Sequence, residues 1–180
     1  LPEPYINLSV ILYKSKRYSE AIDALEKALE LKPSEHSIYA NLAISYGESG
    51  HYEEAVTFGE KAIKLNPKNI YALNYLGRAY SVLGKTDLAV KYYEKAIKLN
   101  NKFGLAYVGM AKARKYSEED RPLINRFTKT LKESMSADDR SRINFCIGKM
   151  LDDCQAWDEA WPYYRQANLL MKKTNDYTPP

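Results

Sequence analysis

The sequence repeats with a period of 34 residues, and this period limits the folds open to it. Two columns of alanine, one of glycine and one of leucine recur at this step. The columns are Ala21/Ala55/Ala89, Ala28/Ala62/Ala96, Gly50/Gly84 and Leu8/Leu42/Leu76, which Met110 continues. Each period holds two apolar stripes of helical spacing, each about a dozen residues long. Because a two-helix unit of this kind cannot bury its apolar face alone, neighbouring units are expected to stack.

Small residues and helix breakers give these columns a physical meaning. The alanines let the second helix of a unit pack close to the first, and Gly50 and Gly84 allow the tight turn between them. Pro33 and Pro67 end the second helix, because proline cannot continue it. The predicted helix pairs are 3–14 with 19–31, 36–48 with 53–65, 70–82 with 87–99, 104–115 with 120–134, and 139–154 with 157–173.

The period loosens after residue 103 and then returns. Ser117 with Asp120 predicts a capping box at the start of a helix. The step from the fourth unit to the fifth is three residues too long, and we place the insertion at 136–139. Pro162 lies inside the last predicted helix, where it should bend the helix or shorten its start.

These columns resemble the tetratricopeptide repeat, with Leu76-Gly77 and Tyr80 at its most characteristic positions. The match is strong over residues 2–101. The resemblance implies an all-α fold, a right-handed α–α superhelix, in a single domain over 1–180. Its units are predicted at 2–35, 36–69, 70–103, 104–137 (degenerate) and 138–174, and 175–180 reads as the start of a linker.

Charge and composition exclude several function classes. The net charge is +4, from 27 basic and 23 acidic residues, and it is spread evenly along the chain. No basic stripe with interleaved aromatic residues predicts nucleic-acid binding, and no apolar run reaches the roughly 20 residues of a membrane span. Cys146 and Cys154 stand eight apart, too far for a disulfide on one helix. Two free thiols favour a reducing compartment, and we expect a cytoplasmic protein.

The residue types that carry catalysis or bind metal lack the necessary spacing. His36 and His51 are isolated, and no histidine stands near either cysteine at metal-binding spacing. Pairs of consecutive carboxylates such as Glu53-Glu54 diverge around a helix, whereas acid–base catalysis needs convergence in a cleft. We therefore expect no enzymatic activity in this chain, no cofactor and no metal.

Protein binding remains as the predicted function. In a stacked solenoid the first helices of successive units line the concave surface. Tyr71, Tyr75 and Arg78 fall on one face of such a helix, as an aromatic and cationic patch suited to an extended peptide. The positive charges of Arg78 and Lys112 favour an acidic peptide. The resemblance adds that an asparagine in the column of Asn7 and Asn41 bonds the backbone of the ligand. The predicted protein-binding residues are Asn7, Asn41, Tyr71, Asn74, Tyr75, Arg78 and Lys112.

One peptide-binding subtype of this family can be tested by register. Members that bind the tails of chaperones carry a clamp for two carboxylates, built from lysine, asparagine and arginine. This chain has Ile6, Val10, Asn41, Tyr71 and Tyr75 at the clamp positions, so only the asparagine is kept. The comparison argues against a chaperone-tail ligand.

The last unit resembles a more specific group. Phe145, Gly148, Trp157 and Trp161, with the residues around them, are similar to the last repeat of bacterial proteins that join tetratricopeptide repeats to a sulfotransferase domain. This resemblance covers about residues 113–175. It implies an alternative function, a non-catalytic accessory or substrate-docking region of a larger sulfotransferase whose catalytic domain would follow Pro180.

Overall fold

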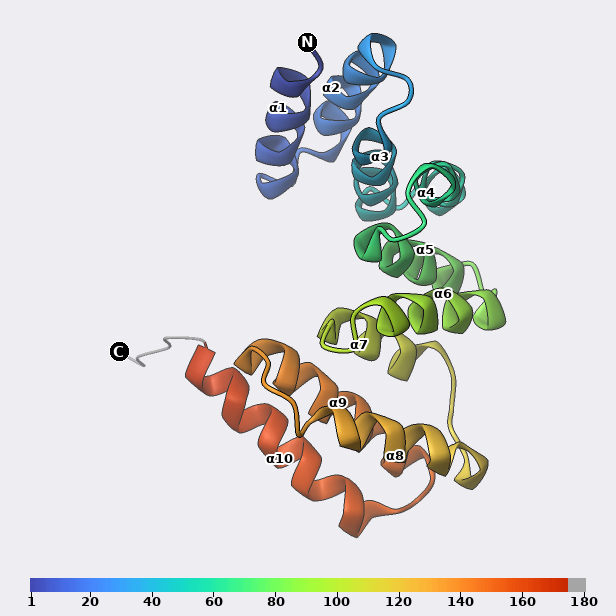
Figure 1. Cartoon of the computed structure of the whole chain (residues 1–180), viewed down its shortest axis with the longest axis vertical. Coiled ribbons are helices and arrows are strands. Elements are labelled where there is room, and N and C mark those ends of the chain that lie inside the picture. Colours follow the sequence, from blue (N-terminus) through green and yellow to red (C-terminus); the bar gives the residue numbers. More distant parts are fainter. Residues whose placement is uncertain (175–180) are drawn as a thin grey trace. The chain divides into compact units, whose positions relative to one another are not determined.

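The computed structural model describes residues 1–174, which fold into helices without a strand (Figure 1). The α-helices are α1 Glu3–Lys14, α2 Tyr18–Leu31, α3 His36–Glu48, α4 Tyr52–Leu65, α5 Ile70–Val82, α6 Thr86–Leu99, α7 Gly104–Ala113, α8 Arg121–Thr130, α9 Ala137–Asp153 and α10 Trp157–Thr174, and a short 3-10 helix spans Glu118–Asp120. This is the predicted fold class, an all-α fold of the α–α superhelix type. The predicted linker start at 175–180 lies outside the described residues.

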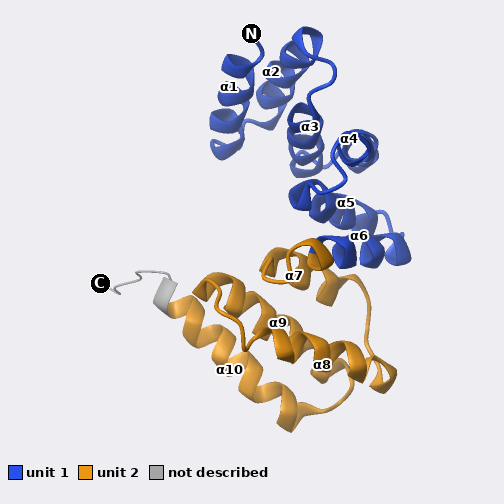
Figure 2. Cartoon of the chain, viewed as in Figure 1, with its two compact units in different colours: residues 1–96 blue, residues 97–180 orange. Residues whose placement is uncertain are grey.

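The chain divides into two compact units, residues 1–96 and residues 97–180 (Figure 2). In the first unit α2 packs on α3 and α4 packs on α5, so that each helix pair stacks on the next. In the second unit α9 packs against both α7 and α10. The single domain over 1–180 stays a prediction.

The alanine columns pack as predicted. The six alanines of the two columns in the first three units are all buried, and so are Ala160 and Ala167 in α10. Aromatic pairs join the two helices within the second and third repeats: Tyr46 of α3 stacks on Phe58 of α4 with ring planes 3° apart, and Tyr80 of α5 stacks on Tyr92 of α6 in the same way. The same tyrosines donate hydrogen bonds across the junctions between repeats, from the Tyr80 hydroxyl to Glu60 Oε1 at 2.6 Å and from the Tyr46 hydroxyl to Glu26 Oε1 at 3.4 Å. Repeat stacking therefore combines apolar burial with one recurring polar contact.

The fourth helix pair differs from its prediction at two ends. We predicted helices to 115 and 134, whereas α7 ends at Ala113 and α8 at Thr130. Arg114 is extended (φ −151°, ψ 171°), and its guanidinium binds the carboxylate of Asp120 with N–O distances of 2.6 and 3.0 Å. The backbone N–H of Ser117 also donates to Asp120 Oδ2, as the predicted capping box requires. These contacts hold residues 114–117 as an extended segment where the helix was expected to continue.

The inserted residues and Pro162 both lie within longer helices. Ser136 caps α9 by accepting a hydrogen bond from Asp139 N–H at 3.0 Å. Because α9 has 17 residues where α3 has 13, the insertion extends the start of that helix. α10 begins five residues before Pro162 and runs through it, so the proline does not shorten the start of the helix.

The tight turns between paired helices need a left-handed backbone residue, and only two of them have glycine there. Gly50 and Gly84 have φ of +88° and +71°, as their column predicted. Lys16 fills the same column in the first repeat with φ of +59°, and Gln155 does so before α10 with φ of +60°. Left-handed backbone costs a residue with a Cβ about 1–2 kcal/mol. The first and last turns are therefore strained relative to the two between them.

We expect Lys16→Gly to raise the free energy of unfolding by about 0.5–1 kcal/mol, because relief of the left-handed strain exceeds the entropy that glycine adds to the unfolded chain. Urea denaturation followed by circular dichroism measures the change. Ser15→Gly is the matched control, since Ser15 has φ of −84° and gains nothing from a missing Cβ. A loss of stability in Lys16→Gly would contradict this account of the turn.

Candidate functional site

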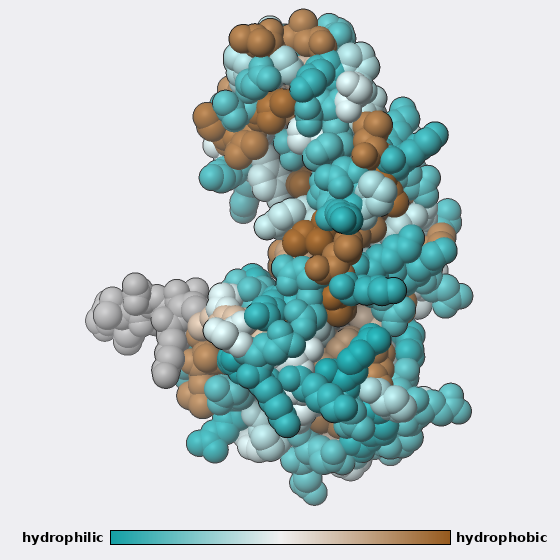
Figure 3. All heavy atoms as spheres, in the orientation of Figure 1, coloured by the Kyte–Doolittle hydropathy of each residue, from teal (hydrophilic) through white to brown (hydrophobic). Residues whose placement is uncertain are grey.

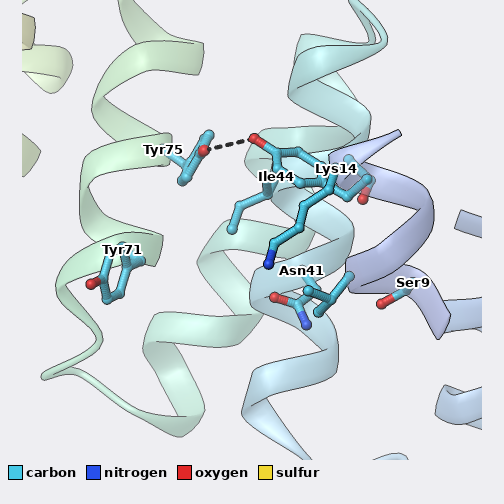
Figure 4. Close-up of a pocket in the computed structure, with 9 residues that line it drawn as sticks. Ser9, Lys14, Asn41, Ile44, Tyr71 and Tyr75 are labelled. Carbon is cyan, nitrogen blue, oxygen red and sulfur yellow. Dashed lines mark hydrogen bonds between the residues drawn. The ribbon is translucent and has the colours of Figure 1, made fainter. Parts of the chain in front are cut away.

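A pocket of about 260 Å³ lies on the first unit, between α1, α3 and α5 (Figure 4). These are the first helices of three successive repeats. The residues that line it are Ser9, Val10, Tyr13, Lys14, Asn41, Ile44, Ser45, Tyr71 and Tyr75. Its volume equals that of about nine waters, enough for one large side chain.

Helical spacing and the 34-residue period together bring these residues to one place. Each helix supplies residues three or four apart, such as Tyr71 and Tyr75, which share a helix face. The period then repeats that face in the next helix: Val10 and Ile44 occupy one column, and Asn41 and Tyr75 another. The pocket is thus a direct product of the repeat.

The walls of the pocket are mostly apolar and aromatic. The Tyr13 and Tyr75 hydroxyls lie 3.3 Å apart and form a hydrogen bond that joins α1 to α5 (Figure 4). Burial raises the pKa of Tyr75 above its usual value, and the hydrogen bond with Tyr13 raises it further. The phenol is therefore neutral at physiological pH. Val10 and Ile44 add aliphatic surface from the two neighbouring helices.

Two polar side chains of the pocket have unused hydrogen-bonding capacity. Within residues 1–174, neither the ammonium of Lys14 nor the amide of Asn41 forms a side-chain hydrogen bond or ion pair. Figure 4 shows the Lys14 side chain extending towards Asn41. An amide offers both donors and acceptors, whereas an ammonium offers donors and a positive charge. This pair suits a ligand that carries peptide groups and a carboxylate.

The structure brings three of the seven predicted binding residues together in this pocket: Asn41, Tyr71 and Tyr75. Asn7 is exposed on α1 outside the pocket. Asn74 is partly buried, and its Oδ1 accepts no hydrogen bond from any described residue. Lys112 belongs to the second unit, where its Nζ lies 6.0 Å from the centre of the Phe145 ring.

Arg78 has a partner that the spacing did not reveal. Its guanidinium forms a bidentate ion pair with Glu48, in which Nη2 lies 3.2 Å from Oε2. This pairing raises the pKa of Arg78 and offsets its charge. The acidic preference predicted from Arg78 and Lys112 therefore has to depend on Lys14 at this pocket, because Arg78 is paired and Lys112 does not line the pocket.

Sequence reasoning did not assign Val10 and Ile44 to the binding site. The signal that would have found them is their column, which continues at Arg78 and places them beside Asn41 and Tyr75. Four of the five clamp positions named above, Val10, Asn41, Tyr71 and Tyr75, line the pocket. The pocket thus occupies the place of a two-carboxylate clamp but has mainly apolar and aromatic walls.

Over the described part of the chain, no cluster of three or more histidine, cysteine, aspartate or glutamate side chains has the geometry to hold a metal ion. None of the described helices combines the length and apolar character that crossing a membrane requires.

Solved structures share this fold. The MamA crystal structure superposes with a TM-score of 0.68 at 20% identity, covering 94% of this chain and 97% of that one. The Arabidopsis OM64 TPR domain gives 0.61 at 23% identity, covering 63% and 93%. The first TPR of Spaghetti (RPAP3), bound to the HSP90 peptide SRMEEVD, gives 0.60 at 24% identity, covering 62% and 89%. At these identities the likeness shows the fold.

Sequence comparison gives the family. A search of curated protein sequences returned no significant match. Tetratricopeptide repeat models match residues 3–68 and 70–103, together more than half of the chain. None of these matches bears on the resemblance to sulfotransferase repeat regions or on a cytoplasmic location, and both stay predictions. The chain belongs to the tetratricopeptide repeat family.

Proposed function

We propose that this protein is a protein-interaction module that binds an extended segment of a partner protein on the concave face of its first three repeats. The pocket between α1, α3 and α5 carries the proposal, because it combines apolar walls with two polar side chains that have no partner within the described chain. A partner segment would place one large apolar side chain between Val10, Ile44 and Tyr71. The proposal assigns the chain no catalytic role.

Asn41 gives the pocket a way to hold a peptide backbone. Its amide can donate to a carbonyl and accept from an N–H of an extended chain. Solved tetratricopeptide neighbours support a peptide ligand: two RPAP3 domains are described as bound to an HSP90 peptide and an HSP70 peptide. Since this chain keeps only Asn41 at the clamp positions, its partner should differ from theirs at the residues that the pocket receives.

Lys14 is the cation of this site, and it favours an acidic residue next to the apolar one. A single exposed ion pair contributes little, about 0–1 kcal/mol, and salt screens it. Affinity is therefore expected to be modest, on the order of micromolar, because one groove must offset the ordering of a flexible segment. Binding should weaken as ionic strength rises.

The test is an array of peptides in which a large apolar residue is followed by an acidic one. Matched peptides replace the apolar residue with alanine, or the acidic residue with its amide. Peptides that bind are then measured by fluorescence anisotropy against the parent and against Tyr71→Ala and Asn41→Ala. We expect each variant to lose at least about tenfold in affinity, or about 1.4 kcal/mol.

Tyr5→Ala is the matched control, because Tyr5 is an exposed tyrosine of α1 that does not line the pocket. It should bind like the parent. Equal binding by all the variants would place the ligand elsewhere, and absence of any bound peptide would argue against an interaction module for extended segments.

A further inference from the structure

The outer face of α1 exposes apolar residues at positions that are buried in the other repeats. Leu8 is 46% exposed and Ile11 is 62% exposed. Their counterparts one and two periods later are all buried: Leu42, Leu76, Ser45 and Ala79. Apolar residues gather over α1 in the space-filling view (Figure 3). The columns of Leu8 and Ile11 are the ones that pack against a neighbouring repeat elsewhere in the chain, so this face has the composition of an interface.

The outer face of α10 shows the complementary feature. Ala160 aligns with Ala21, so Trp161 occupies the column of Ile22. Ile22 is 9% exposed beneath the next repeat, whereas Trp161 is 68% exposed. A hollow of about 440 Å³ lies beside the indole, lined by Trp161, Pro162, Arg165, Gln166 and Leu169. A large aromatic ring next to a hollow can receive a branched aliphatic side chain.

The established stacking interface shows how two such faces fit. At the junction of the first two repeats, Ile22 and Leu25 of α2 form one buried cluster with Ile38 and Leu42 of α3. Trp161 of α10 stands where Ile22 stands, and Leu8 of α1 stands where Leu42 stands. The two exposed faces are therefore the two halves of the interface that already joins the repeats.

We propose that the chain associates head to tail with a second copy of itself, with α10 of one copy packed on α1 of the next. Trp161 then covers Leu8 and Ile11, as Ile22 covers Leu42 within the chain. The inference is independent of the pocket, since neither Leu8 nor Ile11 nor Trp161 lines it.

Charge supports the same orientation. Stacked helices of successive repeats run antiparallel, so the start of α10 would meet the end of α1. Asp158 in the first turn of α10 then approaches Lys16, in the turn that follows α1. At the opposite end Lys172 approaches Glu3. Acidic residues thus meet basic residues at both ends of the contact.

A head-to-tail contact of this kind uses different surfaces on the two copies. Such an interface forms open chains unless its rotation closes a ring, whereas contact of α1 with a second α1 would stop at a dimer. Association should therefore depend on concentration and continue past the dimer.

Sedimentation velocity tests the proposal on the full chain, at concentrations from about 1 μM to several hundred micromolar. Interfaces of micromolar affinity form in this range. We expect the mean mass to rise beyond that of a dimer. Leu8→Lys and Trp161→Lys should each weaken association at least tenfold. Leu65→Lys is the matched control: Leu65 is 47% exposed, as Leu8 is, but lies at the end of α4, and its variant should associate like the parent.

Mixing the two variants gives the sharpest arm of the experiment. Each variant keeps one good face, so an equal mixture of Leu8→Lys and Trp161→Lys should form one-to-one dimers and nothing larger. Circular dichroism confirms that both remain folded. A parent chain that is monomeric throughout overturns the proposal. So does a Trp161→Lys chain that associates like the parent, because α1 would then pair without α10.

Discussion

Replacing Leu42 with alanine is expected to lower the free energy of unfolding by about 2–5 kcal/mol. The Leu42 side chain is fully buried and packs in the cluster of Ile22, Leu25 and Ile38 that joins the first two repeats. Removing it takes apolar atoms out of that cluster and leaves a cavity that rigid helices cannot fill. Urea denaturation at about 0.1 μM protein, well below the concentrations at which interfaces of micromolar affinity form, measures the loss.

The same column supplies the control. Leu8→Ala removes the same atoms from an exposed side chain, and its effect should be within about 0.5 kcal/mol of the parent. A comparable loss in the two variants would mean that Leu8 is covered in solution at that concentration. A small loss in Leu42→Ala would mean that the repeat junction adapts to the cavity.

Replacing Gly77 with alanine is expected to destabilise the chain by about 1–3 kcal/mol. A Cβ on Gly77 would lie 2.7 Å from Cε1 of Tyr93, closer than carbon atoms approach in proteins. The Tyr93 ring is buried against α5 and cannot swing into solvent without opening the packing of α6. Thermal and urea denaturation report the change.

Gly47→Ala tests whether the clash with Tyr93 is the cause, because its effect on the free energy of unfolding should have the opposite sign. A Cβ on Gly47 would lie 3.7 Å from the Ala55 Cβ, an ordinary contact. Since alanine favours helix over glycine by about 0.8–1.0 kcal/mol, this variant should be as stable as the parent or more so. If Gly77→Ala also stabilises, the Tyr93 ring moves more freely than its burial indicates.

The helices and the repeat packing could be predicted from the sequence because they depend on short, periodic signals. The alanine columns, Gly50 and Gly84 each act within one helix pair, and the period multiplies the signal. For the first three repeats the helix bounds agree with the prediction to within one residue. The prediction was less accurate for the fourth helix pair, because α7 ends where Arg114 binds Asp120 through a contact between side chains.

The binding residues were harder to predict because pairing between repeats leaves no periodic trace. Arg78 and Glu48 are 30 residues apart, so no spacing rule within a helix joins them. The column of Leu8 predicts a core residue correctly at Leu42 and Leu76, but at Leu8 no helix of the first unit covers that face. A pattern in the sequence gives the face of a helix, whereas burial depends on what lies against that face.

The position of the two tryptophans determines what their fluorescence can report. The sequence has 16 tyrosines but only Trp157 and Trp161, and both indoles are largely hydrated on the outer side of α10. Their emission therefore changes little on unfolding, and it reports almost nothing about the unfolding of residues 1–96. A denaturation curve followed at tryptophan wavelengths would understate the loss of structure. The same emission is a selective optical label for any molecule that covers α10, without a dye or a tag.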